Sequence, residues 1–141
     1  MKKTERYSTV SFWVPGIPEA QGSMRSPRAG VVLHNKPSLT AWRDLIGFTA
    51  KQAWGTRPLL DWPVRMTCAF YFPKPQRPQH DGWASTSLDL DKLIRAVGDA
   101  LQGVVLKNDS RIVAITAQKR WAGGVLGPQE PGLSVRLETC S

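Results

Sequence analysis

The chain has 141 residues, 41% of them hydrophobic, so we expect one domain with an apolar core over residues 1–141. This composition excludes a disordered chain, and no apolar run approaches the roughly 20 residues of a membrane-spanning helix. Nineteen Lys and Arg against eleven Asp and Glu leave a net charge of +8. Unless it serves solubility alone, that charge favours nucleic acid as the partner over a membrane, because no amphipathic basic helix is present.

The two cysteines, Cys68 and Cys140, provide neither a disulfide framework nor a metal-binding spacing. The charged first residues 1–6 are not followed by an apolar stretch of signal-peptide length. We therefore expect a cytoplasmic protein with free thiols.

The first half of the chain predicts a strand and a helix separated by a long loop. Alternating apolar residues predict a strand over residues 7–14, which Pro15 ends. A loop rich in Gly, Pro, Ser and Arg follows, with a short strand expected at residues 31–33. Ser38 is suited to cap a helix that ends near Gly55.

The second half predicts a helix among three strands. Residues 64–72 alternate as a strand with one apolar face, and three prolines interrupt the segment that follows. Apolar residues at helical spacing predict a helix over residues 90–101, and strands over residues 111–121 and 133–139 end the chain. The order β-α-β-α-β-β indicates an α+β fold, with a single mixed sheet of about four strands and two helices packed on it.

Two aspartates, Asp89 and Asp91, stand where this second helix begins. If the backbone is still extended there, residues two apart project to the same side, and two carboxylates so placed repel each other. A divalent cation removes this repulsion. Asp109 follows the helix, just before the next strand, although the spacing alone does not show that it reaches Asp91. Oxygen ligands without a His or Cys cluster favour Mg²⁺, with Mn²⁺ as the alternative.

Ordinary structural roles also account for each of these aspartates. Asp89 is at a position suited to a helix N-cap, and Asp109 is suited to a turn. Asp91, Arg95 and Asp99 are spaced four apart and can form a solvated ladder worth about 0.2–0.5 kcal/mol per pair. The residues alone leave these alternatives open.

Residues 86–115 resemble the RusA family of Holliday-junction resolvases. The resemblance rests on Asp89-Leu90-Asp91-Lys92-Leu93, Arg95-Ala96, Asp99-Ala100-Leu101 and Asn108-Asp109. It implies that Asp89, Asp91 and Asp109 are the metal-binding and catalytic carboxylates of a homodimer that nicks two opposing strands of a four-way junction, with metal orienting and deprotonating a water.

Two positions depart from the family pattern. Arg95 stands where the family usually has a catalytic lysine, and arginine stays charged near neutral pH, so we expect Arg95 to clamp a phosphate electrostatically. Asn108 stands where the family has the first aspartate of a pair, so this position adds no charge.

Further cations are candidates for contacts with DNA phosphates. They lie in loops interrupted by proline or beside the aspartates: Arg25, Arg28, Lys74, Arg77 and Lys92. Two other functions fit the same residues, namely a DNA-binding module without catalysis and a nuclease acting on forks or flaps.

Overall fold

The computed structural model describes residues 7–21 and 37–141. These ranges contain four strands, two α-helices and one 3-10 helix. In chain order they are β1 (Thr9–Pro15), α2 (Pro37–Trp54), β2 (Val64–Phe72), α3 (Leu90–Leu101), η1 (Asp109–Arg111), β3 (Ile112–Trp121) and β4 (Gly132–Thr139). The expected order and the α+β class are confirmed.

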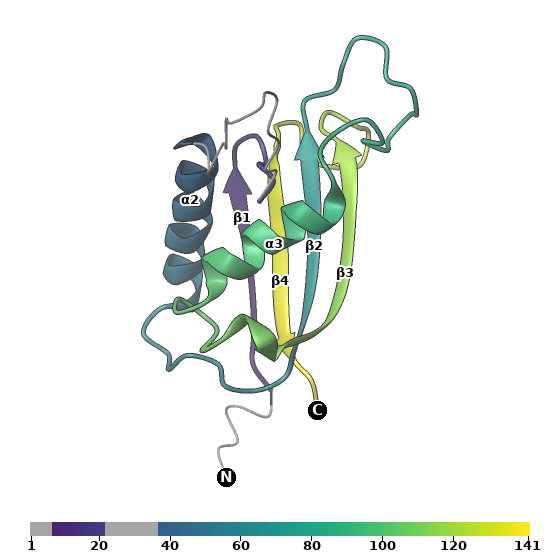
Figure 1. Ribbon diagram of the computed structural model, residues 1–141. Helices are drawn as coiled ribbons and strands as arrows, with labels where there is room; N and C mark the ends of the chain where they lie inside the picture. Colours follow the sequence, from purple (N-terminus) through teal and green to yellow (C-terminus); the bar gives the residue numbers. More distant parts are fainter. Residues whose placement is uncertain (1–6, 22–36) are drawn as a thin grey trace, which may run out of the picture.

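The four strands form one mixed sheet in the order β1-β4-β2-β3. β4 pairs antiparallel with both β1 and β2, so the last strand along the chain lies inside the sheet (Figure 1). β2 and β3 are parallel neighbours. A parallel pair needs a long connection, and α3 is part of it.

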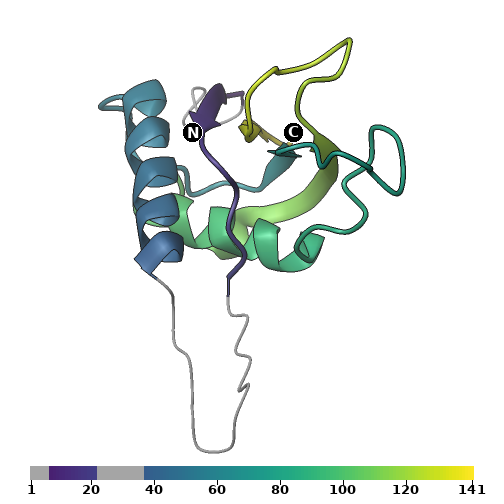
Figure 2. The same ribbon diagram turned by 90° about the horizontal axis from the view of Figure 1, so that it is seen from above.

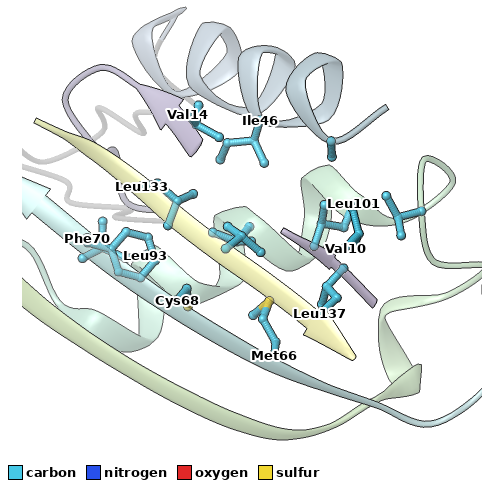
Figure 3. Close-up of a cluster of buried hydrophobic side chains, with 14 of the residues drawn as sticks. Val10, Val14, Ile46, Met66, Cys68, Phe70, Leu93, Leu101, Leu133 and Leu137 are labelled. Atoms are coloured by element: carbon cyan, nitrogen blue, oxygen red, sulfur yellow. The ribbon is translucent and has the colours of Figure 1, made fainter. Parts of the chain in front are cut away.

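Both helices cover the same face of the sheet (Figure 2). The alternation of β2 places every second side chain in the core, and Phe70 is fully buried there. Ile46 from α2, Leu93 from α3 and Leu133 from β4 lie in the same buried cluster (Figure 3). The core therefore fills the space between the sheet and the two helices, and α3 has only one side free for solvent.

Element boundaries differ from expectation by a residue or two. α2 begins at Pro37 and not after Ser38. The first amide groups of a helix have no intrahelical partner, so proline is well tolerated at its first position. Arg111 belongs to η1 and not to the strand that follows. The strand expected at residues 31–33 lies outside the described residues. Neither described helix combines the length and apolar character needed to cross a membrane.

Candidate functional site

The side of α3 that faces away from the core carries the charged residues. Leu93, Val97 and Leu101 are fully buried, whereas Asp91 and Arg95 are exposed. These two residues are one helical turn apart on the exposed side. The helical periodicity that predicted a buried stripe thus also directs Asp91 and Arg95 to solvent.

Asp89 occupies the N-cap position of α3 without acting as a side-chain cap. Its backbone is extended, with φ −65° and ψ 131°, and its carboxylate accepts no capping hydrogen bond. That carboxylate is 70% exposed and lies 3.7 Å from the Lys92 ammonium group. The N-cap interpretation therefore holds for the position of Asp89 but not for its side chain.

The alternative interpretation of Asp91, Arg95 and Asp99 as a ladder of ion pairs along α3 does not hold within the described residues. Asp99 lies 3.9 Å from the guanidinium of Arg43, which belongs to α2. Within the described residues, no ion pair or hydrogen bond joins Arg95 to Asp91 or to Asp99. Asp91 and Arg95 thus present unpartnered charges on the surface.

Asp109 begins the 3-10 helix η1 and is held there through its neighbours. Its amide donates to Gln102 Oε1 at 3.0 Å. The Asn108 side chain caps η1, because its Oδ1 accepts from the Ser110 amide at 2.9 Å. Asn108 thus has a structural role. Asp109 takes part in the turn through its backbone, because its carbonyl accepts from the Ile112 amide.

A longer-range contact secures the other end of η1. Arg111 Nε donates to Asp61 Oδ1 at 2.7 Å, and Lys107 Nζ lies 3.6 Å from the same carboxylate. The hydrogen bond from Arg111 is the largest cause that lowers the pKa of Asp61 below its ordinary value, followed by the positive charges of Arg111 and Lys107. The Asp109 carboxylate has no partner of its own within the described ranges.

The fold places Asp109 beside the middle of α3. A Cβ atom built on Gly98 would lie 3.9 Å from Asp109 Cβ. Gly98 follows Asp91 by two turns, or about 10 Å at 1.5 Å per residue, and Arg95 lies between them on the same side. We call Asp91, Arg95 and the adjacent Asp109 the α3 strip.

The α3 strip is not a closed metal cage. Among the residues that the structure describes, no group of three His, Cys, Asp or Glu side chains is close enough to hold one ion. The chemistry of the donors nevertheless fits a hard divalent cation, because Asp91 and Asp109 are exposed carboxylates without a competing partner. Asp89, at the start of the same helix, adds a third carboxylate oxygen donor.

The remaining cations expected to contact DNA are spread along the preceding loop and α3. Lys74 lies 3.9 Å from Asp81, Lys92 accompanies Asp89, and Arg77 is exposed. Arg25 and Arg28 lie outside the described residues. The structure therefore places Lys92 beside the aspartates and the other two described cations on the protruding loop of residues 73–89 (Figure 1).

Sequence reasoning missed the groups that hold the site in place. Asp61 and Arg111 are about 50 residues apart in sequence, and Lys119 Nζ donates at 2.8 Å to the Leu88 carbonyl, just before Asp89. Such contacts join segments that only the folded sheet brings together, so no local spacing signals them. Gln102, seven residues before Asp109, is by contrast close to its target in sequence.

Comparison with known families gives a result that covers almost the whole chain. The sequence model of the RusA family, described as Endodeoxyribonuclease RusA, matches residues 15–138. No curated protein matches the chain. The matched range contains the α3 strip and every residue that holds it.

Proposed function

The chain belongs to the RusA endodeoxyribonuclease family, and on that premise we propose that it resolves four-way (Holliday) junctions by paired nicks, as a Mg²⁺-dependent homodimer. The α3 strip is the observation that carries this proposal. Its two carboxylates have no partner within the described residues, and a free arginine lies between them on an exposed surface. Because none of these charges is used in an ion pair within those residues, all three side chains are available to bind a ligand.

The residues of the strip have separate tasks in this proposal. Asp91 and Asp109, with Asp89, would hold Mg²⁺, which when bound supplies Lewis-acid stabilisation of charge on the phosphate. The Arg95 guanidinium remains charged at all relevant pH values and offsets charge on the non-bridging phosphate oxygens. Lys92, already paired with Asp89, adds a second cation at the same helix end.

A comparison of DNA structures tests the substrate. We expect purified protein with Mg²⁺ to nick a four-way junction faster than matched forked, flapped, duplex and single-stranded DNAs. The nicks should fall at symmetric positions on opposing strands, because a two-fold dimer presents two identical sites. Faster cutting of forks or flaps would identify a nuclease of different substrate choice. Binding without nicking under every condition would identify a non-catalytic module.

Substitution of the carboxylates tests the site. Asp89→Asn, Asp91→Asn and Asp109→Asn should each reduce nicking at least about a hundredfold, equivalent to about 2.7 kcal/mol of transition-state stabilisation. Junction binding should remain, because no phosphate-binding cation is removed. Asp44→Asn is the matched control, since Asp44 is an exposed carboxylate on α2 outside the strip. A variant that nicks at the wild-type rate removes that aspartate from the site.

The choice of cation provides an independent test. Mg²⁺ or Mn²⁺ should support nicking, whereas Ca²⁺ should permit binding with little turnover, because its larger and looser coordination shell positions ligands differently. Nicking at the full rate in excess EDTA would contradict the metal requirement.

A further inference from the structure

Two loops at the upper end of the sheet enclose a cavity outside the α3 strip. One loop covers residues 73–89 and the other covers residues 122–131, and both project from the same end of the sheet (Figure 1). The cavity between them has a volume of about 400 Å³, and Tyr71, Lys74 and Arg120 line it together with glycines of the second loop. Pockets for small ligands measure about 300–1,000 Å³. This cavity can therefore hold one nucleotide, whereas a base-paired duplex is too wide to enter.

The cavity opens on the face of the sheet that the helices leave uncovered. Burial alternates along β2, so the Tyr71 side chain points away from the core, where Phe70 is buried. Arg120 is the register partner of Tyr71 on the parallel strand β3, so its side chain is on the same face. Both helices cover the opposite face (Figure 2). The cavity is therefore separate from the α3 strip, which is on the helix side.

Aromatic rings stand on both sides of Arg120. An isolated bridge pairs Trp83 with Arg120, and the guanidinium carbon lies 4.0 Å from the centre of the Trp83 ring. On the other side, the ring centres of Tyr71 and Trp13 are 6.0 Å apart. The Trp13 ring reaches this position because it occupies the space that a side chain on Gly132 would need. Rings and guanidinium planes of this kind are the surfaces on which unpaired bases stack.

A second arginine-on-tryptophan pair shows what is particular to this one. The Arg57 guanidinium lies 3.7 Å from the centre of the Trp54 ring. Trp54 is only 3% exposed, and its ring nitrogen donates to the carbonyls of Arg57 and Pro58, so that pair closes the core. Trp83 is 50% exposed beside the cavity. Its ring surface therefore remains accessible to a ligand.

The rim of the cavity combines positive charge with exposed apolar side chains. The Lys74 ammonium lies 3.9 Å from the carboxylate of Asp81, which is 95% exposed and also lines the cavity. Such a solvated pair is worth little, so Lys74 can exchange it for a phosphate. Val125 and Leu126 line the same cavity and are 99% and 98% exposed. Burial of these two side chains against a ligand would be favourable.

We propose that this cavity binds one unpaired nucleotide of a single DNA strand. The base lies against the Tyr71 ring and the Arg120 guanidinium, Lys74 binds the adjacent phosphate, and Val125 and Leu126 pack against the next base. The strand is DNA because the chain belongs to an endodeoxyribonuclease family. A strand is favoured over a free nucleotide because a free nucleotide fills the cavity but leaves the apolar rim in water.

The cavity gives a reason for a preference for branched DNA, and this step rests on the proposed function. Neighbouring residues of a strand point to opposite faces. Arg120 borders the cavity, whereas Lys119 Nζ on the helix side donates to the Leu88 carbonyl, next to Asp89. The end of β3 thus lies between the cavity and the start of α3. A nucleotide unpaired at a branch point would enter the cavity while the adjoining strand reaches the carboxylates, and an intact duplex has no such nucleotide.

Two substitutions test the cavity in different ways. Arg120→Met keeps an unbranched chain over the Trp83 ring but removes the charge and the guanidinium plane. Gly124→Leu adds a side chain to the cavity lining, and the fold accommodates it because nothing lies within 4 Å of a Cβ atom built on Gly124. The matched controls are Arg57→Met, at the other stacked arginine, and Thr56→Leu, which adds a leucine on an exposed loop. Circular dichroism melting checks that each variant folds.

Fluorescence anisotropy in Ca²⁺ measures the binding of a labelled oligothymidine of about eight residues and of a blunt duplex of matched length. We expect both controls to bind the oligothymidine as wild type does, and Arg120→Met and Gly124→Leu to bind it at least about tenfold more weakly. Duplex affinity should change by less than about threefold in every variant.

Three results would overturn the proposal. The first is an oligothymidine affinity that neither cavity variant lowers, and the second is an equal loss of duplex affinity. The third is competition by thymidine monophosphate as effective as that by unlabelled oligothymidine, which would identify a pocket for a free nucleotide.

Photochemical crosslinking of the wild type decides the question if a variant fails to fold. An oligonucleotide in which 5-iodouracil replaces thymine, irradiated in the complex, should crosslink to Tyr71 or Trp83, as detected by mass spectrometry of the digested protein. Crosslinks found only outside residues 71–83 and 120–127 would exclude the cavity.

Junction nicking in Mg²⁺, measured on the same samples, separates this inference from the proposed function. A wild-type protein that nicks junctions but whose oligothymidine binding does not depend on the cavity refutes the nucleotide site and leaves the nuclease intact. Cavity-dependent binding of the oligothymidine without nicking of any DNA refutes the nuclease and leaves the nucleotide site intact.

Discussion

Asn108 offers the sharpest test of how the fold positions Asp109. Its side chain accepts one hydrogen bond, from the Ser110 amide at 2.9 Å, which caps η1. Removal of an N-cap acceptor costs about 0.5–2 kcal/mol, and this exposed cap on a single-turn helix belongs in the lower half of that range. We therefore expect Asn108→Ala to lower the free energy of unfolding by about 0.5–1 kcal/mol.

Asn108→Asp keeps an acceptor at the same place and should leave stability within about 0.5 kcal/mol of wild type. Because the cap helps to hold Asp109, Asn108→Ala should also slow nicking, but by no more than about fivefold, the factor that corresponds to about 1 kcal/mol. The Mg²⁺ concentration for half-maximal nicking should be the same in Asn108→Asp and wild type, because we assign position 108 to the turn and not to the metal.

Urea unfolding and Mg²⁺ titrations of nicking measure the two effects. Gln76→Ala serves as the control, since Gln76 is an exposed amide in the loop of residues 73–89. If Asn108→Asp lowers the half-maximal Mg²⁺ concentration about tenfold or more, position 108 contributes a ligand and the structural assignment is wrong. Unchanged stability of Asn108→Ala would show that the cap contributes nothing.

Three further predictions concern charge and burial. Arg95→Ala should reduce nicking by at least about tenfold with little loss of junction affinity, and Arg95→Lys should recover most of the rate. An Arg95→Ala variant that nicks at the wild-type rate would show that Arg95 is an ordinary solvated residue. Burial raises the pKa of the Cys68 thiol to about 12, so a thiol reagent should label only Cys140 in the native protein and both cysteines in denaturant. Equal native labelling rates would contradict the buried position of Cys68. The hydrogen bond from Arg111 depresses the folded-state pKa of Asp61 below its ordinary value of 3.8, so its stabilising effect is present above that pH and is lost as the pH falls through the folded pKa. Acid unfolding of Asp61→Asn should therefore be less steep below about pH 4 than that of wild type, and identical curves would show that the pair does not stabilise the fold.

Local patterns predicted the elements of this protein well because periodicity depends on neighbours in sequence. The alternation of residues 64–72 and the helical spacing of residues 90–101 gave the same bounds as β2 and α3. The same helical spacing determined that Asp91 and Arg95 face solvent, since a buried stripe on one side leaves the other side exposed. The helical spacing and the family resemblance together predicted that Asp91 and Arg95 belong to a candidate site.

Tertiary structure alone decided how these elements meet. Periodicity shows which face of a strand is buried but not which strand lies beside it, so the place of β4 between β1 and β2 had no local signal. The spacing of Asp99 allowed a pair with Arg95 along its own helix, yet the packing of α2 against α3 gives it Arg43. Asp109 reaches the middle of α3 and not the start of the helix, because the chain that enters β3 passes beside Gly98.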